Sequence, residues 1–485
     1  MQAESAAGNS FSPAPAIAPH DALAELWRCA DLPRRALEQI TIGGRDPVVP
    51  SSFALGTALG ASLGAAALAA GEFGAQRGGA RQTVQLDLHD AVRESACHFT
   101  LDGRVPPMWD KVSGLYRCGG SSAAPGWVRL HANFAHHRDG ALALLGLPTG
   151  PNTPRSAVEA ALQRWPAEDF EQAAAARGLV VAALRTPEQW QAHPQAAAVA
   201  LLPLVDLVRL GDAPPRRSEP IEAGAPPLRA LRVLDLTRIL AGPVAGRTLA
   251  AYGADVMLVN SPRLPNIEAI AETSRGKLSA HVDLKTEAGR ETLRALLRGA
   301  DVFLQGYRPG ALEALGFGPD ELARLAPGIV CVSLSAWGHR GPWAGRRAFD
   351  SLVQSATGLN WAEAAAFGGS EPRALPLQAL DYGAGYLLAF GALAALQRQR
   401  RDGGSWLVRV ALAGVGAWLQ RLGPVVAGPQ APKLDFTDVM EETDSGFGRL
   451  AAVRHSVRLS AAPVGWARPS MPPGSHAPVW PVAGA

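Results

Sequence analysis

The chain has 485 residues and a formal net charge of +3, and 47% of its residues are hydrophobic. This length predicts two or three globular domains, and the composition excludes a largely disordered chain. The charge is mildly basic and no block of like charge occurs. Both features favour an anionic small molecule over nucleic acid or a membrane surface as the partner.

The beginning of the chain and its cysteines bear on localisation. Residues 1–20 lack a basic start and a sustained apolar core, so we expect a flexible N-terminal tail rather than a signal peptide. The four cysteines lie far apart and form no CxxC pair. This spacing predicts reduced thiols in the cytoplasm rather than a disulfide scaffold or a zinc site.

Residues 53–71 are uncharged and as long as a membrane span, with the sequence FALGTALGASLGAAALAAG. Alanine and glycine are only weakly hydrophobic. Gly56, Gly60 and Gly64 also place small residues on one helical face, where a second backbone can approach closely. We therefore expect a helix buried inside the protein and no membrane span.

The pattern of elements changes at a linker over 211–228, which is rich in proline and glycine. Before it, helical periods dominate, as in 156–178. After it, short strands alternate with helices, which predicts a parallel, doubly wound α/β sheet. The expected strands are 231–237, 254–260, 301–307 and 328–337. The resulting division is a tail (1–20), a larger mixed α/β half (21–210), the linker, a Rossmann-like half (229–424) and a proline-rich, extended C-terminal extension (425–485).

The chain contains an internal repeat, because residues 55–92 resemble residues 380–415. Each copy consists of a Gly/Ala-rich helix, a charged end, a Gly-Gly turn and an alternating strand. The second copy places Asp381 at the start of its helix, where the first copy has Leu55 or Gly56. An aspartate is a favoured helix N-cap, and a carboxylate there can also be a nucleophile. The first copy builds its helix without this acid, which indicates that capping alone does not explain Asp381.

Three short motifs after the linker are candidate binding elements. RILAGP (238–243) follows the first strand of this half, at the edge where open α/β sheets bind ligands, but it lacks a GxGxxG fingerprint. SRGK (274–277) and GYRPG (306–310) offer cations that suit phosphate or carboxylate, or that are simply solvated loops. The histidines of HANFAHH (131–137) have spacings that do not suit a metal site. His137 could instead line a ligand pocket.

The sequence from LRVLDLTRILAGPVAG to LPLQALDYGAGYLLAFGALAAL resembles the class III CoA-transferases, the CaiB/BaiF family, with several motifs in family order. The N-terminal half is similar to the part that follows the catalytic aspartate in that family. The chain therefore resembles a member whose halves are exchanged and whose junction is duplicated. This implies a CoA-transferase family III-like α/β fold.

The resemblance also implies a reaction. An acyl-CoA and a carboxylic acid would exchange coenzyme A through an acyl-aspartyl anhydride and an aspartyl-CoA thioester. Asp381 would be the nucleophile, and Gly383 would let the thioester approach. No tightly bound cofactor and no metal are implied, coenzyme A being a substrate, and the family forms interlocked homodimers.

The resemblance assigns coenzyme A to a set of matched positions, which are Arg238, Leu240, Ala241, Arg275, Lys277 and Arg308. Two positions depart from the family. Asn260 stands where a glutamate usually ends the second strand, and Gly306 replaces the asparagine of the turn before Arg308. Cofactor binding could therefore differ in detail.

Two alternative functions remain open on the sequence. An α-methylacyl-CoA racemase needs an acid/base pair, but Phe349 stands where the racemases have a histidine. A non-catalytic paralogue that binds CoA esters is the other alternative. The exchanged halves favour it, whereas the intact Asp381 and its glycines speak against it.

Overall fold

The computed structural model describes residues 16–119, 125–216 and 219–481. Most of the predicted N-terminal tail therefore lies outside the described residues. Within them the first helix, α1 (Pro19–Cys29), begins just inside that predicted tail. It packs Leu23, Leu26 and Trp27 into the main core.

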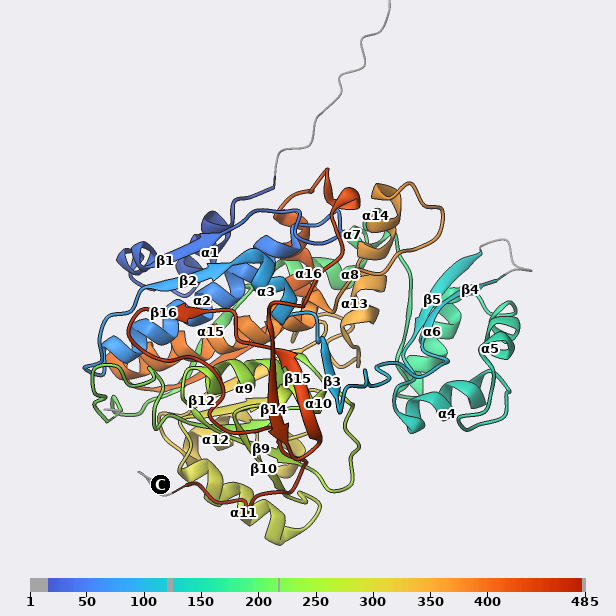
Figure 1. Cartoon of the computed structure of the whole chain (residues 1–485). Coiled ribbons are helices and arrows are strands. Elements are labelled where there is room, and N and C mark those ends of the chain that lie inside the picture. Colours follow the sequence, from blue (N-terminus) through green and yellow to red (C-terminus); the bar gives the residue numbers. More distant parts are fainter. Residues whose placement is uncertain (1–15, 120–124, 217–218, 482–485) are drawn as a thin grey trace, which may run out of the picture.

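A seven-stranded sheet forms the centre of the main body, in the order β10-β9-β8-β11-β12-β13-β7 (Figure 1). All neighbouring pairs are parallel except β13 and β7. This confirms the predicted doubly wound α/β sheet. The strands are β7 (Asp206–Gly211), β8 (Arg232–Leu236), β9 (Asp255–Asn260), β10 (Lys277–His281), β11 (Val302–Gln305), β12 (Val330–Ser335) and β13 (Ser405–Ala411).

Helices cover both faces of this sheet, because side chains alternate along each strand. On one face, β-strand residues such as Leu234 and Phe303 pack against α11 (Glu287–Arg298) and α12 (Pro319–Leu325). On the other, residues such as Val233 and Val302 belong to a core that includes α9 (Ala241–Ala251) and α15 (Ala379–Asp402).

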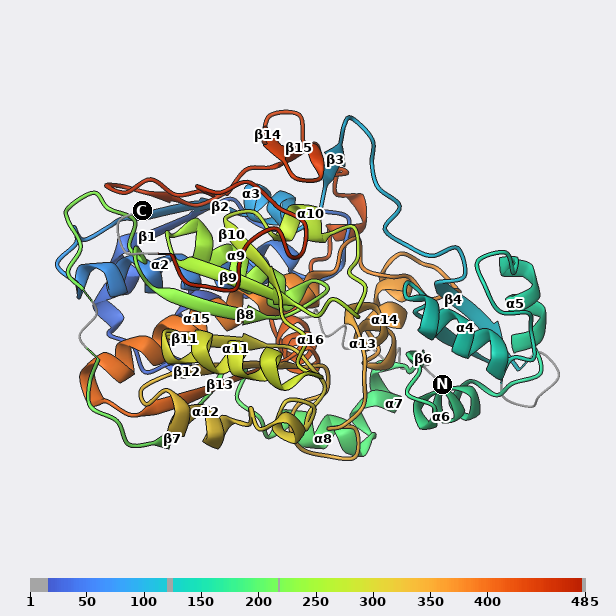
Figure 2. The same cartoon turned by 90° about the horizontal axis from the view of Figure 1, so that it is seen from below.

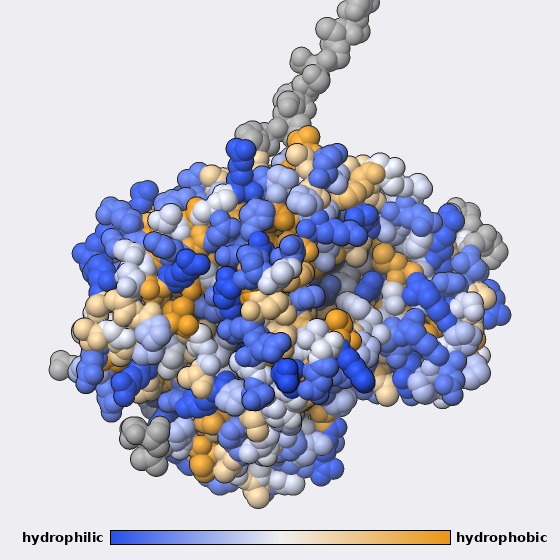
Figure 3. Space-filling view, in the orientation of Figure 1, coloured by the Kyte–Doolittle hydropathy of each residue, from blue (hydrophilic) through white to orange (hydrophobic). Residues whose placement is uncertain are grey.

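The apolar helix α2 (Leu55–Ala75) packs against α15 in the middle of the body (Figure 1). The two helices are the only ones in the described residues that are long and apolar enough to cross a membrane, and 94% and 100% of their apolar windows are buried inside the protein. This confirms the expectation that 53–71 forms a buried helix. On the face drawn in Figure 3, hydrophilic and hydrophobic residues are intermingled without a continuous apolar belt.

The internal repeat is visible in three dimensions as two helix–strand–helix units. The first is α2, β2 (Val84–Asp87) and α3 (Leu88–Glu94), and the second is α15, β13 and α16 (Leu412–Arg421). Strand β13 lies in the central sheet, whereas β2 lies in a small sheet between β1 (Ile40–Gly43) and β16 (Arg458–Leu459).

The predicted half 21–210 is divided between the main body and a separate lobe, which is seen at the right of Figure 1. The lobe has its own apolar core. The predicted helical run 156–178 is two helices, because Pro166 caps the second one. The lobe's elements are β4 (Gly114–Cys118), β5 (Gly126–Leu130), α4 (Ala135–Leu144), α5 (Arg155–Leu162), α6 (Ala167–Ala176) and β6 (Val181–Ala183).

Shorter elements connect the lobe and the sheet. Residues from the lobe return to β7 through α7 (Pro187–Gln191) and α8 (Pro194–Ala200), while α10 (Ile270–Thr273) precedes β10. Between β12 and α15 lie α13 (Asp350–Ala356) and α14 (Leu359–Ala366). Helix α13 contacts β5 and β6 and so connects the lobe to the body.

The C-terminal extension wraps over the main body, as predicted, and is partly a sheet (Figure 2). Its hairpin of β14 (Met440–Ser445) and β15 (Gly448–Val453) pairs with β3 (Phe99–Leu101). Further on, the Trp466 ring covers the Arg275 guanidinium, with 3.8 Å between the guanidinium carbon and the ring centroid. The extension lies away from the pocket described below, since none of its residues line it.

Candidate functional site

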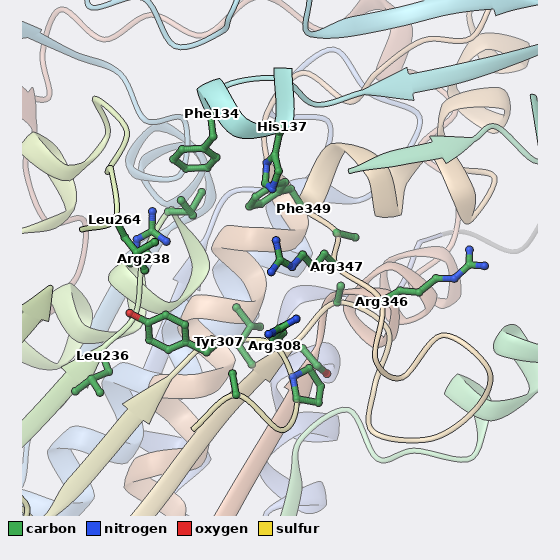
Figure 4. A pocket seen from close by; sticks show the side chains of 18 of the residues that line it. Phe134, His137, Leu236, Arg238, Leu264, Tyr307, Arg308, Arg346, Arg347 and Phe349 are labelled. Carbon is green, nitrogen blue, oxygen red and sulfur yellow. The ribbon is translucent and has the colours of Figure 1, made fainter. Parts of the chain in front are cut away.

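A pocket of about 410 Å³ lies at the C-terminal ends of β8, β11 and β12, and the lobe helix α4 closes its other side (Figure 4). Strand β8 has β9, the next strand in the chain, along one edge and β11 along its other edge. The pocket is therefore at the topological switch point, where open α/β sheets bind their ligands. Its lining comprises Phe134, His136, His137, Leu236, Arg238, Ile239, Leu264, Gly306, Tyr307, Arg308, Pro309, Ala311, Leu334, Ser335, Ala336, Arg346, Arg347, Ala348 and Phe349.

The pocket is cationic, with four arginines and no aspartate or glutamate among its lining residues. Arg238 donates to the Pro265 carbonyl, and Arg346 lies 3.9 Å from the Glu171 carboxylate. The side chains of Arg308 and Arg347 have no hydrogen bond or ion pair to any described residue. Burial, and then the nearby Arg308, lower the pKa of Arg347. Unpaired guanidiniums placed together in this way suit a phosphate or carboxylate ligand.

A second hollow of about 230 Å³ adjoins the pocket, and the two share Leu236, Leu264, Tyr307 and Ala311 as lining residues. Its walls are mainly apolar. At its rim Arg263 pairs with Asp283 at 2.7 Å, and Lys285 also lines it. The combined groove is thus an apolar slot beside a cluster of guanidiniums, an arrangement that suits a flat, phosphorylated ligand.

Two carboxylates meet behind the Phe349 end of the pocket. The Asp381 amide, in the first turn of α15, donates to Asp350 Oδ2 at 2.9 Å. Gln354 donates to the other oxygen of Asp350, and Arg129 from β5 attracts the same carboxylate. Asp381 is 7% exposed, and its own carboxylate has no hydrogen bond to a described residue. It does not line the pocket; it is joined to it through Asp350, which follows Phe349.

The two carboxyl groups resist ionisation. Burial raises the pKa of Asp350 to about 6, although the amides of Asp381 and Leu380, Gln354 and Arg129 oppose the effect. Burial, and then the Asp350 carboxylate, raise the pKa of Asp381 well above its ordinary value. Two carboxylates that share a buried site do not both ionise easily. Such perturbed pairs are typical of functional sites.

The first repeat copy has the same cap without the second acid. Asp46 accepts from the amides of Gly56 at 2.9 Å and Thr57 at 2.8 Å. Because Asp350 binds the amides of Leu380 and Asp381, the matching of the caps aligns Thr57 with Asp381. The sequence alignment placed Leu55 or Gly56 opposite Asp381, so it was shifted by one or two residues from the structural alignment. The capping role belongs to Asp46 and Asp350, which leaves the Asp381 side chain without a structural task.

This pairing supplies a test of Asp350. A nearby buried charge of the same sign raises a carboxyl pKa, so Asp350→Asn should lower the pKa of Asp381. We expect the rise of any Asp381-dependent activity with pH to begin about one pH unit or more lower in this variant. The sign follows because a carboxylate nucleophile, the role that the sequence predicts for Asp381, reacts in its ionised form. The measurement is a kcat/KM profile over pH.

Asp46→Asn is the matched control. It removes the same capping charge from α2 while its carboxamide oxygen can still accept one of the two amide bonds, so it should cost only about 0.3–1 kcal/mol of stability. It should leave the pH profile unchanged. An equal shift in both variants would show that Asp350 acts on helix structure alone.

The structure places the predicted site residues in two groups. Arg238 and Arg308 line the pocket. Leu240 and Ala241 lie at the start of α9, buried behind it, and do not line it. Gly383 is inside α15, where an added Cβ would come within 3.2 Å of Val415. A Cβ added at Gly385 would lie only 2.6 Å from the Ala241 carbonyl oxygen, so the absence of a side chain at this glycine lets α15 pack on α9.

Arg275 and Lys277 lie away from the pocket. Lys277 is fully buried and donates to Asp235 and to the Pro243 carbonyl, both at 2.8 Å. Arg275 donates to Glu272, Glu441 and the Val453 carbonyl. The geometry gives no support to their predicted contact with coenzyme A, because every ion pair that they make is internal to the fold.

The structure also locates the remaining residues that the sequence analysis singled out. Gly306 lines it, and the Asn260 carboxamide accepts from Asn266 at 2.9 Å. His137 lines it, as one reading of the sequence suggested. No group of three or more metal-ligating side chains occurs in the described residues. The sequence prediction missed Arg346 and Arg347 as pocket residues. Two consecutive arginines just before Phe349 and Asp350 could have indicated a site for an anion.

The fold and pocket define an open α/β protein with a cationic groove at the switch point of its sheet. Residues 228–427, which include both Asp350 and Asp381, match the profile of CoA-transferase family III. The match to that family is confined to this part of the chain.

Curated relatives match the same region. A probable fatty acyl-CoA transferase of Mycobacterium tuberculosis is 35% identical over 215 residues, which are 41% of this chain and 54% of the relative. The succinyl-CoA–D-citramalate CoA-transferase of Chloroflexus aurantiacus is 30% identical over 41% of this chain and 52% of its own length. The formyl-CoA:oxalate CoA-transferase of Streptomyces coelicolor is 32% identical over 38% and 47%. The chain thus spans about half the length of these relatives.

Solved structures match in part. A crystal structure of the M. tuberculosis protein Rv3272 is 37% identical, with a TM-score of 0.38, over 41% of this chain and 56% of that one. A CaiB/BaiF family protein from Brucella suis is 26% identical, with a TM-score of 0.36, over 46% and 65%.

Proposed function

We propose that the protein transfers coenzyme A from an acyl-CoA to a carboxylic acid, with Asp381 as the covalent nucleophile. One observation carries the proposal. Within the family III segment, Asp381 has a buried carboxylate with no structural partner, and it is held by its amide beside a cationic, switch-point pocket. The named CoA-transferases among the relatives support the same reaction class.

We place the coenzyme A moiety in the combined groove. Arg238 and Arg308 would bind its pyrophosphate, since charge-assisted bonds to guanidinium are strong. The adenine would lie in the apolar slot near Leu264 and Tyr307. The pantetheine arm would then run toward Phe349, which brings the thioester to the Asp350–Asp381 end. Coenzyme A is here a substrate and a product, not a resident cofactor.

The reaction balances in four exchanges. An Asp381 oxygen attacks the thioester carbonyl carbon, the C–S bond breaks, and an acyl-aspartyl anhydride and CoA thiolate form. The thiolate attacks the aspartyl carbonyl, which releases the donor acid and leaves an aspartyl-CoA thioester. The acceptor carboxylate displaces the thiolate to form a second anhydride. The thiolate then attacks the acceptor carbonyl, which gives the new acyl-CoA and restores Asp381.

This chemistry requires the pocket wall to open. Asp381 is nearly buried, and its amide binds Asp350, which directly follows the lining residue Phe349. In this proposal Phe349 moves aside to admit the thioester to the carboxylate. The phenyl ring carries no group that transfers a proton, so it adds nothing in favour of a racemase. From the family resemblance we also propose a homodimer in the cytoplasm.

Covalent trapping tests the proposal. The full-length protein is incubated with a panel of acyl-CoAs and hydroxylamine, followed by intact mass spectrometry and peptide mapping. We expect a hydroxamate on Asp381 with at least one donor. A hydroxamate on Asp350 instead would contradict the assignment of the nucleophile. Binding of CoA esters without any adduct would identify a non-catalytic CoA-ester-binding protein.

A further inference from the structure

His137 is a buried polar side chain without a partner. It lies near the start of α4 in the lobe, is 5% exposed, and lines the pocket. Neither of its ring nitrogens has a hydrogen-bond partner among the described residues. Figure 4 shows its imidazole beside Phe349 and above Arg347. The centroids of the His137 and Phe349 rings are 6.3 Å apart.

Burial, together with the charged and titratable neighbours of His137, favours its neutral form. Burial, and then His136, Arg347 and Arg238, lower its pKa to about 4. A neutral imidazole has one N–H donor and one acceptor nitrogen. A buried polar group without a partner destabilises the fold, so its retention in a pocket wall points to a partner on the ligand.

The position of His137 indicates which part of the ligand it meets. Arg238 and Arg308 lie near the β-strand ends, whereas Arg347 and Phe349 precede Asp350 and so mark the reacting end. Arg238 and Arg308 also lie within electrostatic range of His137 and Arg347, respectively, so the two ends of the pocket are continuous. A group that meets His137 on the side of Phe349 is the part of the ligand next to Asp350, which is where the acyl chain would lie. An N–H donor beside a guanidinium suits an oxygen atom, above all a carboxylate.

We propose that His137 hydrogen-bonds an oxygen substituent on the acyl chain, so that the site selects oxygenated acyl thioesters, carboxyacyl or hydroxyacyl, over plain alkyl ones. This inference rests on the proposed function. A site built to hydrogen-bond a substrate oxygen discriminates strongly against an analogue that lacks it, because its buried polar group is then left unpaired.

The experiment measures binding, which separates this inference from the chemistry. Calorimetry on full-length Asp381→Asn, which cannot turn over, gives Kd values for succinyl-CoA, 3-hydroxybutyryl-CoA and butyryl-CoA. We expect at least one oxygenated thioester to bind about 10–100-fold more tightly than butyryl-CoA, the range of one or two neutral or charged hydrogen bonds. The one that binds more tightly identifies the substituent as a carboxylate or a hydroxyl.

His137→Phe should reduce this preference to less than about threefold, and His137→Gln, which keeps a donor, should retain part of it. His131→Phe is the matched control. His131 is also buried and neutral and stacks on Phe349 at 4.1 Å, but it does not line the pocket. Its replacement should leave the preference unchanged.

Three outcomes overturn the inference. Equal binding of all three thioesters, or a preference that His137→Phe leaves intact, overturns it alone. A failure of every CoA ester to bind overturns the proposed function together with it.

Discussion

Asp381→Asn should lower the rate of the proposed CoA transfer at least about 10³-fold, because an amide oxygen cannot form the anhydride of the proposed mechanism. The substitution should cost little stability. The Asp381 carboxylate has no hydrogen bond to a described residue, and the amide that anchors the helix to Asp350 belongs to the backbone. Removal of a charge that burial and Asp350 both disfavour should instead hold the thermal midpoint constant or raise it.

The measurement is single-turnover transfer at saturating acyl-CoA, together with thermal unfolding of the same preparation. Thr57→Asn is a control at the aligned position of the first repeat copy, which lies outside the pocket. It should leave the transfer rate unchanged. A residual rate in Asp381→Asn within tenfold of the parent would contradict covalent catalysis at this residue, and a large loss of stability would show that Asp381 is a structural group.

The strand–helix alternation after the linker could be read from the sequence because those elements are local. The residues of β8 and β11 form short apolar runs, and the pattern of hydrophobic residues within each run is enough to predict a strand without knowledge of its distant partners. The same holds for the buried helix α2, whose alanine and glycine content excluded a lipid-facing surface before the structure showed α15 against it.

The site was harder to predict because it depends on contacts between distant segments. SRGK looks like a solvated basic loop until Asp235, 42 residues before Lys277, is seen to pair with it. Conversely, Arg347 lies in a loop of ordinary composition, and only the fold brings it beside Arg308 and the lobe residue His137. Asp350 required the structure for the same reason, since its capping contact spans 31 residues.

The exchanged order of the two halves stays a prediction from the resemblance, and the fold gives it a physical setting. Helices α2 and α15 pack on each other within one chain, and the Gln76 and Gln397 carboxamides near their C-terminal ends are bonded at 2.9 Å. The lobe of the N-terminal half also forms one wall of the pocket of the C-terminal half. One chain therefore assembles both halves of its own site.

Lys277→Met should lower the free energy of unfolding by about 3–5 kcal/mol, because it leaves the buried Asp235 carboxylate without its counter-ion. Both side chains are completely buried, and Lys277 Nζ is 2.8 Å from Asp235 Oδ2. Burial lowers the pKa of Lys277, and the Asp235 carboxylate opposes this effect. Each charge therefore stabilises the other inside the protein. Asp235→Leu combined with Lys277→Met should recover part of the loss, since a well-packed apolar pair can replace a buried ion pair.

Denaturant titration of the single and the double variant checks this expectation, with Arg401→Met as the control. Arg401 pairs with Asp402 at the same short range, 2.7 Å, but on the surface, and its loss should cost less than about 1 kcal/mol. The same Lys277→Met protein, assayed well below its unfolding midpoint, also tests the predicted contact with coenzyme A. If Lys277 only supports the sheet, the KM for acyl-CoA stays within about threefold. A rise of tenfold or more, the loss expected for one charge-assisted phosphate bond, would instead place this lysine in the binding site.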